Sequence, residues 1–380
     1  MVTLNIPVHV LTHQRINHMS IVSCVKVDQK STNPEVVFSA VKKAMELAHW
    51  EKYVKGKNLV LKVNVVWDTI YPSCTTTPMV IEGVLKVIKA SKYKPEKITI
   101  VDTDTAAIMR ADISFKVQGI EELAKKYGAT VVNLSHTEFR LVPFAKALVL
   151  HKLKISKVLL DADTIVTMPV LKTHSYSSMT GALKNQWGCI HDLRHNFHMV
   201  LHQAIADVNN FFKGKITFAL MDGLFGMEGK GPKTGSPLKI GYIFASPDRV
   251  ALDTAASRVM GIDPQTVKHI TFAQQVGVGS MKTEIVGDKL PQFKFEQANQ
   301  SNIVMGTEMW LRHRGKWMEW LMFDAKSPFL LFLRWAAKIY YDLWYKLVGI
   351  KHVEKMMKTN YGIMWKERYL LPYSSLSELE

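Results

Sequence analysis

Two short apolar segments, NLVLKV at Asn58–Val63 and KITIVD at Lys97–Asp102, decide the fold class of this chain. Each has the length and composition of a buried β-strand. Between them, Thr77-Pro78 supplies a helix start, after which valine and isoleucine recur at helical spacing. A strand, a helix and a second strand in this order predict two parallel strands joined by a crossover helix.

The same alternation continues on both sides of this unit. Strands that alternate with helices of ten or more residues are typical of an α/β fold, in which a mostly parallel sheet carries helices on both faces. Further strands are expected at 21–27, 130–134, 164–170, 216–222 and 239–245, and helices at 34–50, 118–127, 198–212, 248–260 and 264–276.

The chain changes character after about residue 300. Six of the nine tryptophans fall in the last 80 residues, where strand patterns disappear. We therefore expect an irregular N-terminal arm at 1–20, an α/β core domain at 21–300 and an aromatic-rich helical extension at 301–380. The first 20 residues contain no continuous apolar stretch, so the sequence does not predict a signal peptide.

The net charge of +16 and the pI of about 9.5 suit nucleic acid, an anionic membrane surface or an anionic small molecule. Lysine and arginine are spread along the chain without a long basic run, which argues against nucleic acid. The three cysteines, Cys24, Cys74 and Cys189, form no CxxC pair. This argues against a zinc ribbon or a self-contained iron–sulfur cluster, and it favours a reducing, cytoplasmic location.

Polar side chains follow four of the expected strands at the point where each strand ends. In open α/β sheets, ligands bind beyond the carboxyl ends of the strands, so we expect these side chains to meet at one edge. They are Asn64 after the first quoted strand, with Lys62 just inside it, Asp102 at the end of the second, Lys172 and His174 after 164–170, and Asp222 at the end of 216–222.

The segments PVLKTH at 169–174 and TGALKN at 180–185 place two lysines, a histidine and an amide close together in the sequence. Lys172, Lys184 and Asn185 are donors that suit phosphate or carboxylate oxygens. Desolvation would also lower the pKa of such a lysine and make it a base or a nucleophile. His174 is the candidate acid or base, because the ordinary pKa of histidine is closest to neutrality.

A glycine-rich segment runs from Asp222 to Pro237, with five glycines in thirteen residues. The backbone of Gly229–Gly231 would form a nest of N–H groups for an anion, to which Lys230 and Lys233 add positive charge. Glu228 would orient a ligand or bind a metal. The segment matches neither a Walker loop nor GxGxxG, and the alternative is a glycine-rich hairpin without a ligand.

Four histidines, His191, His195, His198 and His202, have the spacing i, i+4, i+7 and i+11, which would place them on one face of a helix. A histidine pair at i and i+4 is a workable chelate for a divalent metal. The alternative is that these histidines face a ligand or form hydrogen bonds in the core.

Within residues 329–348, the charged residues Arg334, Lys338, Asp342 and Lys346 lie four apart and form one narrow stripe among apolar and aromatic residues. Burying four charges in a bilayer, at about 2.5–3.5 kcal/mol each, argues against a membrane-spanning helix. Two alternatives stay open. The helix lies on the inner membrane surface with its cations outward, or it packs on the core or on a partner subunit.

Several motifs, in order between about residues 20 and 280, resemble the domain of unknown function 362 family. They are Lys62-Val-Asn64, Thr76-Thr77-Pro78, Asp102, PVLKTH at 169–174, TGALKNQWG at 180–188, MDGLFGMEGKGPKTGSP at 221–237 and ASPDRVALD at 245–253. The resemblance implies an α/β domain without a settled activity. Many members carry ferredoxin-type cysteine clusters, which implies redox work. This chain lacks those cysteines, so the redox reading requires a separate ferredoxin as partner.

The leading functional hypothesis is an enzyme that acts on an anionic small molecule. In it, Lys62, Lys172 and Lys184 bind the anion, while Asp222 and Glu228 bind a cation or move protons. Asn64, Asp102, Asn185 and the Gly229–Gly231 backbone complete the expected binding residues. The alternatives are a redox or metal-dependent protein that works with an iron–sulfur partner, and a non-catalytic module at the membrane surface.

Overall fold

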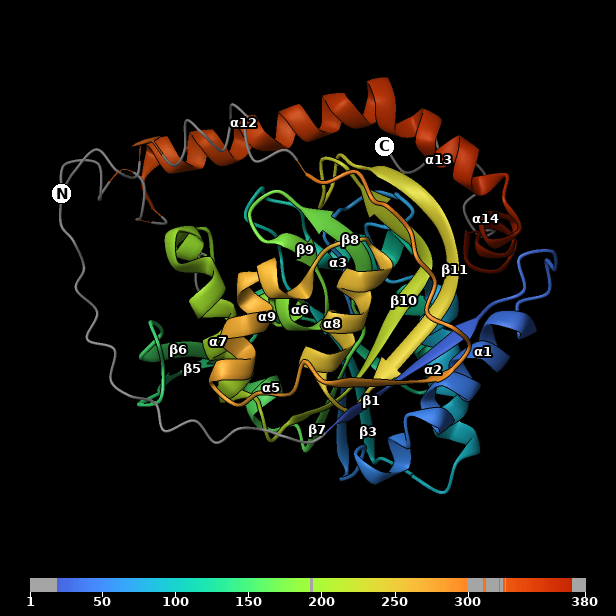
Figure 1. The fold of residues 1–380 in the computed structure, drawn as a ribbon. Helices are drawn as coiled ribbons and strands as arrows, with labels where there is room; N and C mark the ends of the chain where they lie inside the picture. Colours follow the sequence, from blue (N-terminus) through green and yellow to red (C-terminus); the bar gives the residue numbers. More distant parts are fainter. Residues whose placement is uncertain are drawn as a thin grey trace.

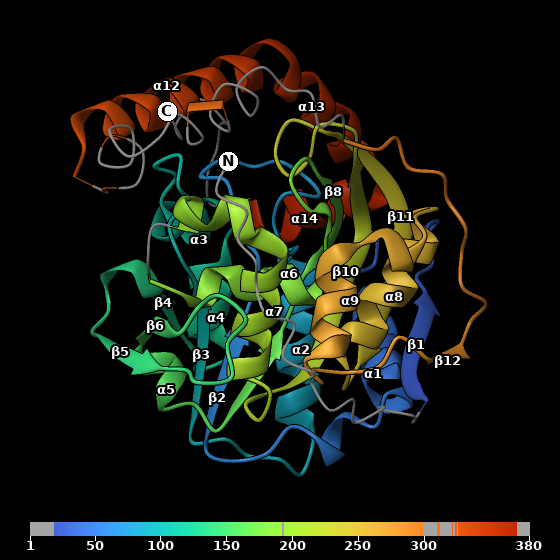
Figure 2. The same ribbon diagram turned by 60° about the vertical axis from the view of Figure 1, so that its left-hand side comes forward.

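The structure is a computed structural model that describes residues 19–191, 194–298, 310–311, 321, 324 and 326–370. Most of the N-terminal arm expected at 1–20 therefore lies outside the described residues. Figures 1 and 2 show a twisted sheet through the centre of the molecule, with helices packed on both of its faces.

The central sheet has ten strands, eight of which follow the order β12-β1-β11-β10-β7-β2-β3-β4, while β8 pairs with β10 and β9 pairs with β8. All neighbouring strands are parallel except for the pairs made by β11 and β9, which confirms a mostly parallel sheet. The strands are β1 (Ser20–Lys26), β2 (Asn58–Lys62), β3 (Lys97–Asp102), β4 (Thr130–Asn133), β7 (Thr164–Thr167), β8 (Val170–His174), β9 (Ser178–Thr180), β10 (Ile216–Glu228), β11 (Ser236–Ser246) and β12 (Thr283–Gly287).

Two apolar layers cover the two faces of this sheet, because successive strand side chains point to opposite faces. Val60 of β2 packs in the layer under α5–α9, whereas its neighbours Leu59 and Leu61 pack in the layer under α1–α4 and α14. The helices are α1 (Glu35–Leu47), α2 (Pro78–Ala90), α3 (Ala111–Val117), α4 (Ile120–Lys126), α5 (Lys157–Leu160), α6 (Ala182–Asn185), α7 (Leu201–Phe211), α8 (Arg249–Val259), α9 (Lys268–Gln275), α12 (Pro328–Trp344), α13 (Ile350–Met357) and α14 (Asn360–Trp365).

Short 3₁₀ and π-helical turns complete the chain. The 3₁₀ turns are η1 (Trp50–Lys52), η2 (Leu134–His136), η3 (Gln186–Cys189), η4 (Arg194–Val200) and η5 (Pro264–Thr266). The π-helical turns are η6 (Tyr345–Gly349), which continues α12, and η7 (Lys366–Leu370), which continues α14.

Several elements differ from the sequence expectations. The strand expected at 164–170 is divided into β7 and β8 around Pro169, which has no N–H for a sheet ladder. The helix expected at 118–127 is α4, and the sequence analysis missed α3, which ends before Gly119, a residue with a φ of 72°. The sequence analysis also missed β12 and the separate antiparallel hairpin of β5 (Phe139–Pro143) and β6 (Lys152–Ser156).

The glycine-rich segment is mostly strand rather than loop, because β10 extends to Glu228 and pairs with the antiparallel β11. Gly223 permits this pairing, since a Cβ atom there would lie 2.7 Å from the carbonyl oxygen of Tyr242 on the neighbouring strand. The hairpin alternative thus describes the backbone of this segment, and only residues 229–235 form a loop.

The C-terminal helices pack on the core. Trp344 stacks on Trp67 with ring centroids 6.1 Å apart, and Trp365 of α14 is completely buried. Arg368 donates two hydrogen bonds, of 2.7 and 2.6 Å, to the buried carboxylate of Glu82 in α2. Burial raises the pKa of Glu82, but the bonds from Arg368 and its neighbours outweigh this and lower it to about 2.

Within the described residues, no helix combines the length and the apolar character that crossing a bilayer requires.

Candidate functional site

A buried ion pair occupies the carboxyl ends of β2 and β3. Lys62 Nζ lies 2.8 Å from Asp102 Oδ1 and also donates to the carbonyl oxygen of Val63 at 2.7 Å. The Asp102 carboxylate in turn accepts the backbone N–H groups of Val65 and Thr103 at 2.7 and 2.8 Å. Both charges are therefore satisfied inside the protein, so this pair holds the two strand ends together.

Two asparagines connect this ion pair to Lys172 on β8. Lys172 Nζ donates to Asn64 Oδ1 at 2.5 Å and to the carbonyl oxygen of Cys74 at 2.9 Å. Asn64 Nδ2 donates to Asn185 Oδ1 at 3.1 Å, and Asn185 Nδ2 donates to the Lys62 carbonyl oxygen at 3.0 Å. The structure thus brings together five of the expected residues, which we call the strand-end network: Lys62, Asn64, Asp102, Lys172 and Asn185.

Lys172 has only neutral hydrogen-bond acceptors, although it is completely buried. Burial, together with the charge of nearby Lys62, lowers the pKa of Lys172 to about 8, against the opposing effects of Cys74 and Asp102. The hydroxyl oxygens of Thr75 and Thr180 are buried and have no hydrogen-bond partner among the described residues. Thr180 is the cross-strand partner of Lys172, so their side chains share one face of the sheet.

Asp222 lies next to the strand-end network but serves the backbone. Its carboxylate accepts the N–H groups of Thr77 at 2.7 Å and Leu224 at 3.0 Å, which fixes the start of α2 against β10. Burial raises the pKa of Asp222 to about 6, although these bonds oppose the shift. Its expected role in binding a cation or moving protons stays a prediction.

Lys184 is the basic side chain of the site that lacks a partner. Among the described residues, no hydrogen bond or ion pair is formed by Lys184, which lies on the short helix α6. The carboxylate of Asp253 holds this helix in place by accepting the N–H groups of Ala182 and Leu183 at 2.6 and 2.9 Å. Burial, followed by repulsion from Arg194 and Lys172, lowers the pKa of Lys184 to about 7.

Other basic groups surround Lys184. Burial is the main cause that lowers the pKa values of three histidines, and the charge of Lys184 lowers the same pKa values as well. We define the cationic cluster as Lys184 together with the groups coupled to it: His174, Arg194, His202 and His269. At pH 7 its positive charge comes from Arg194 and the protonated fraction of Lys184, because the lowered pKa values leave the histidines neutral. Arg194 donates to the hydroxyl of Thr103 and to the carbonyl oxygen of Asp104. Its guanidinium therefore joins the cluster to the loop after β3.

His174 is buried, and its Nδ1 atom accepts the backbone N–H of Tyr176 at 3.1 Å. Burial and the nearby Lys184 keep the pKa of His174 well below its ordinary value, so the ring is neutral at pH 7. Because Nδ1 is the acceptor in this bond, the neutral ring carries its proton on Nε2. His174 thus offers a hydrogen-bond donor to a ligand.

The four histidines expected on one helix face do not lie on one α-helix, because α7 begins only at Leu201 and η4 precedes it. His191 stacks on Phe139, with ring centroids 4.4 Å apart. His198 stacks on Tyr176 at 4.3 Å, and His202 stacks on His269 at 5.9 Å. The side chain of His195 lies outside the described residues. The geometric premise of the metal prediction was therefore wrong, although metal binding itself stays a prediction.

The glycine-rich loop does not offer a free nest. The N–H of Gly229 donates to the Glu296 carbonyl oxygen, and that of Gly231 donates to the Gly229 carbonyl oxygen, both at 2.7 Å. Lys230 is exposed, and Glu228 Oε2 accepts the backbone N–H of Glu296 at 2.9 Å. Glu228 follows Met227, the strand partner of Lys172, so its side chain points to the opposite face. Glu228 is thus turned away from Lys172.

Sequence reasoning missed Arg194, His269 and Thr75 as neighbours of the site, and it quoted Thr180 in TGALKN without giving it a role. Arg194 and His269 approach it from η4 and α9, which follow no strand end. The hydroxyls of Thr75 and Thr180 belong to threonine, which occurs throughout the chain, so the residue type alone did not mark them. The signals that pointed to these hydroxyls were the Thr76-Thr77-Pro78 motif, next to Thr75, and the TGALKN segment, which begins at Thr180.

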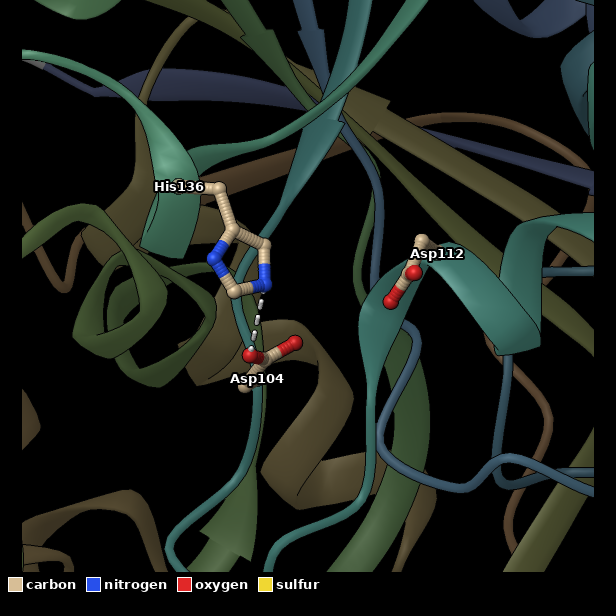
Figure 3. A group of neighbouring side chains, drawn as sticks. All are labelled: Asp104, Asp112 and His136. Carbon is tan, nitrogen blue, oxygen red and sulfur yellow. Dashed lines mark ion pairs between the residues drawn. The ribbon is translucent and has the colours of Figure 1, made fainter.

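A further group of potential ligands lies beyond β3 and β4, where one atom each from Asp104, Asp112 and His136 lie within 4.8 Å of one another (Figure 3). His136 Nε2 is 3.4 Å from Asp104 Oδ2. Asp112 forms an ion pair with Arg110, and Asp104 Oδ1 accepts a hydrogen bond from the amide of Asn133 at 2.7 Å. These contacts hold the loop before α3 in place, which explains why the three side chains lie together.

The three cysteines are buried and not disulfide-bonded. Burial is the main cause that raises the thiol pKa values, to about 12 for Cys24, about 11 for Cys74 and about 12 for Cys189. All three are therefore protonated at neutral pH, which makes them poor metal ligands in this conformation.

Comparisons with known proteins find a curated relative and several solved structures, including the following two. A thylakoid-associated protein of Synechocystis is 31% identical over 144 residues, which are 36% of this chain and 44% of that protein, so the match spans less than half of the relative. A Thermotoga maritima protein aligns at 14% identity over 51% of each chain with a TM-score of 0.31. The lactate racemase apoprotein of Thermoanaerobacterium thermosaccharolyticum aligns at 17% identity over 64% of this chain and 57% of its own, with a TM-score of 0.40.

The motifs that suggested a family lie mainly in the region around the strand-end network. The model of the domain of unknown function 362 family matches residues 59–258, which are more than half of the chain and run from β2 into α8. This chain therefore belongs to the domain of unknown function 362 family.

Proposed function

We propose that this protein is an enzyme that binds a phosphate- or carboxylate-bearing small molecule at the cationic cluster. The observation that carries this proposal is Lys184, a basic group without a partner among the described residues, beside Arg194 and Lys172. Holding several basic groups together without neighbouring acidic groups raises the free energy of the folded protein, unless an anion binds between them. A ligand with two negative charges would offset this repulsion.

The neighbouring groups support the choice of an anion. Asp102, whose charge acts on Lys172, is already engaged by Lys62 and by two backbone N–H groups. Lys172 has neutral acceptors, and the hydroxyls of Thr75 and Thr180 have no partner among the described residues. Hydroxyl and ammonium donors of this kind suit the oxygens of a phosphate or carboxylate.

The chemistry would depend on Lys184. With a pKa of about 7, a large fraction of this amine is neutral at physiological pH, so it serves as a general base or as a nucleophile toward a carbonyl carbon. The Nε2–H of His174 would donate a hydrogen bond to the bound anion. The strand-end network would hold Lys172 in place while the ligand is bound.

The test measures binding first and chemistry second. Sulfate and inorganic phosphate are titrated into the full chain by calorimetry, and native mass spectrometry of freshly purified protein identifies a retained anion. Lys184→Met should weaken sulfate binding at least about tenfold, since hydrogen bonds to charged groups contribute about 1.5–3 kcal/mol. Lys230→Met is the matched control, because Lys230 is exposed on the nearby loop. Equal binding by both variants would overturn the site assignment.

A second variant separates binding from catalysis. Lys184→Arg keeps a positive charge but does not lose its proton near neutral pH. We expect it to retain the anion but to lose turnover of the compound identified by mass spectrometry. Turnover equal to that of the unmodified protein would remove Lys184 as the base or nucleophile.

A further inference from the structure

The helix α12 and the turn η6 present a row of large apolar side chains to the outside. Nine of the sixteen large hydrophobic residues that are exposed among the described residues fall between 331 and 350. They recur at the spacing of one helix face, and Leu347 and Phe332 are 70% and 64% exposed. We call this surface the apolar ridge: Leu331, Phe332, Trp335, Ile339, Tyr340, Leu343, Leu347, Val348 and Ile350.

The opposite side of the same helix is bound to the core. Arg334 Nε donates to the carbonyl oxygen of Ala106 at 2.7 Å, and Lys338 Nζ lies 3.4 Å from Asp68 Oδ2. Lys338 also pairs with Asp342 at 3.1 Å. Arg334 and Lys338 thus face the loops after β3 and β2, which fixes the rotation of the helix and leaves the apolar ridge outward.

The chain around the apolar ridge is strongly basic. Residues 326–370 contain nine lysines and arginines against three aspartates and glutamates. Lys346, Lys351, Lys355 and Lys358 are exposed at the end of the ridge and along α13. Figures 1 and 2 show α12 running along the outer edge of the molecule, where a flat surface would meet it along its length.

We propose that the apolar ridge inserts into the interface of a membrane whose surface carries anionic lipid headgroups. Amphipathic helices lie in this way, with apolar and aromatic side chains below the headgroups and lysines paired with anionic lipids. Charge complementarity selects this occupant over a second copy of the chain, because the lysines of two facing copies would repel one another. The proposal does not depend on the anion site.

The orientation differs from the one considered from the sequence, in which the cations of the stripe faced outward. Here Arg334 and Lys338 bind the core, and the lysines near the membrane are those of η6 and α13. The loops after β2 and β3, which lead to the strand-end network, lie directly beneath α12. Membrane attachment would therefore bring the cationic cluster close to the membrane surface.

The experiment is vesicle flotation with the full chain. Vesicles of phosphatidylcholine with phosphatidylglycerol are compared with vesicles of phosphatidylcholine alone, at low and high salt. We expect binding to the anionic vesicles that weakens with salt, because the lysine contribution is screened. Replacing Phe332, Ile339 and Leu343 with serine should raise the lipid concentration needed for half-maximal binding at least about tenfold.

Leu141→Ser is the matched control, since Leu141 is 57% exposed on β5, away from α12. Circular dichroism and a urea melt verify that the triple variant is folded. Absence of flotation in the unmodified protein overturns the proposal, as does equal flotation of the triple variant. Concentration-dependent dimers that the triple variant abolishes, without lipid binding, would assign the ridge to a second copy instead.

Discussion

Sulfate binding at the cationic cluster should weaken as the pH rises above about 7. Burial and its basic neighbours lower the pKa of Lys184 to about 7, and burial lowers that of Lys172 to about 8. A bound dianion favours the protonated form of both amines, so each pKa rises on binding and the protein takes up protons. The affinity for sulfate is therefore highest below the pKa values that the two lysines have in the free protein, and it falls as the pH rises through these values.

The magnitude follows from these two values. Each lysine that must be protonated reduces the affinity about tenfold per pH unit, or ~1.4 kcal/mol, between its free and its bound pKa. Between pH 7 and 8 the loss comes mainly from Lys184, so about tenfold is expected. Above pH 8 the loss is steeper, because Lys172 also loses its proton.

The assay is calorimetric titration with sulfate, which does not itself titrate in this range, at pH 6, 7, 8 and 9 and at constant ionic strength. Two buffers with different heats of ionisation give the proton uptake, which should be about half a proton at pH 7. Lys184→Met should remove most of the slope between pH 7 and 8. A constant affinity from pH 6 to 9, or the same slope in the variant, would refute the reasoning.

Two further predictions concern stability. Lys62→Met should lower the free energy of unfolding by about 3–5 kcal/mol, because it leaves the buried Asp102 without its counter-charge. The exposed pair of Lys57 gives the control, and Lys57→Met should cost less than about 1 kcal/mol in the same urea titration, so equal losses would contradict the argument. Burial lowers the pKa of Lys233 to about 7, against about 10.4 in the unfolded chain. The unfolded state therefore binds more protons between these values, so stability should rise with pH in that window, and Lys233→Met should flatten the rise. The measurement is urea unfolding of both proteins at pH 7, 8 and 9. If the burial of Lys233 has no energetic effect, the free energy of unfolding will depend on pH in the same way in the unmodified protein and in Lys233→Met.

The sheet was predictable because apolar composition and strand length carry information about a buried parallel strand. NLVLKV and KITIVD became β2 and β3, which pair in parallel register. The predictions of secondary structure failed where a segment distant in the sequence determines the backbone conformation. The glycines of β10 suggested a loop, but Gly223 serves the close approach of β11, and nothing local distinguishes these two uses.

The candidate site shows the same limit at the level of side chains. The topology rule gathered Lys62, Asn64, Asp102 and Lys172 correctly, because they follow parallel strands. The rule does not give the direction of a side chain, which reverses with a shift of one residue along a strand. Glu228 therefore lies near the end of β10 but points away from Lys172.

The helix α12 shows how a correct pattern can leave orientation undetermined. The four-residue spacing of Arg334, Lys338 and Asp342 established that one face is charged and the other apolar. Which face meets the protein depends on acceptors elsewhere in the chain, namely Asp68 and the carbonyl oxygen of Ala106. These acceptors lie in loops far away in the sequence, so the pattern of α12 alone does not locate them. Tyr341 and Trp344 pack on the core beside this charged stripe, and the remaining apolar side chains are left outside. This is why a surface helix of an otherwise well-packed protein exposes leucine, phenylalanine and tryptophan in one row.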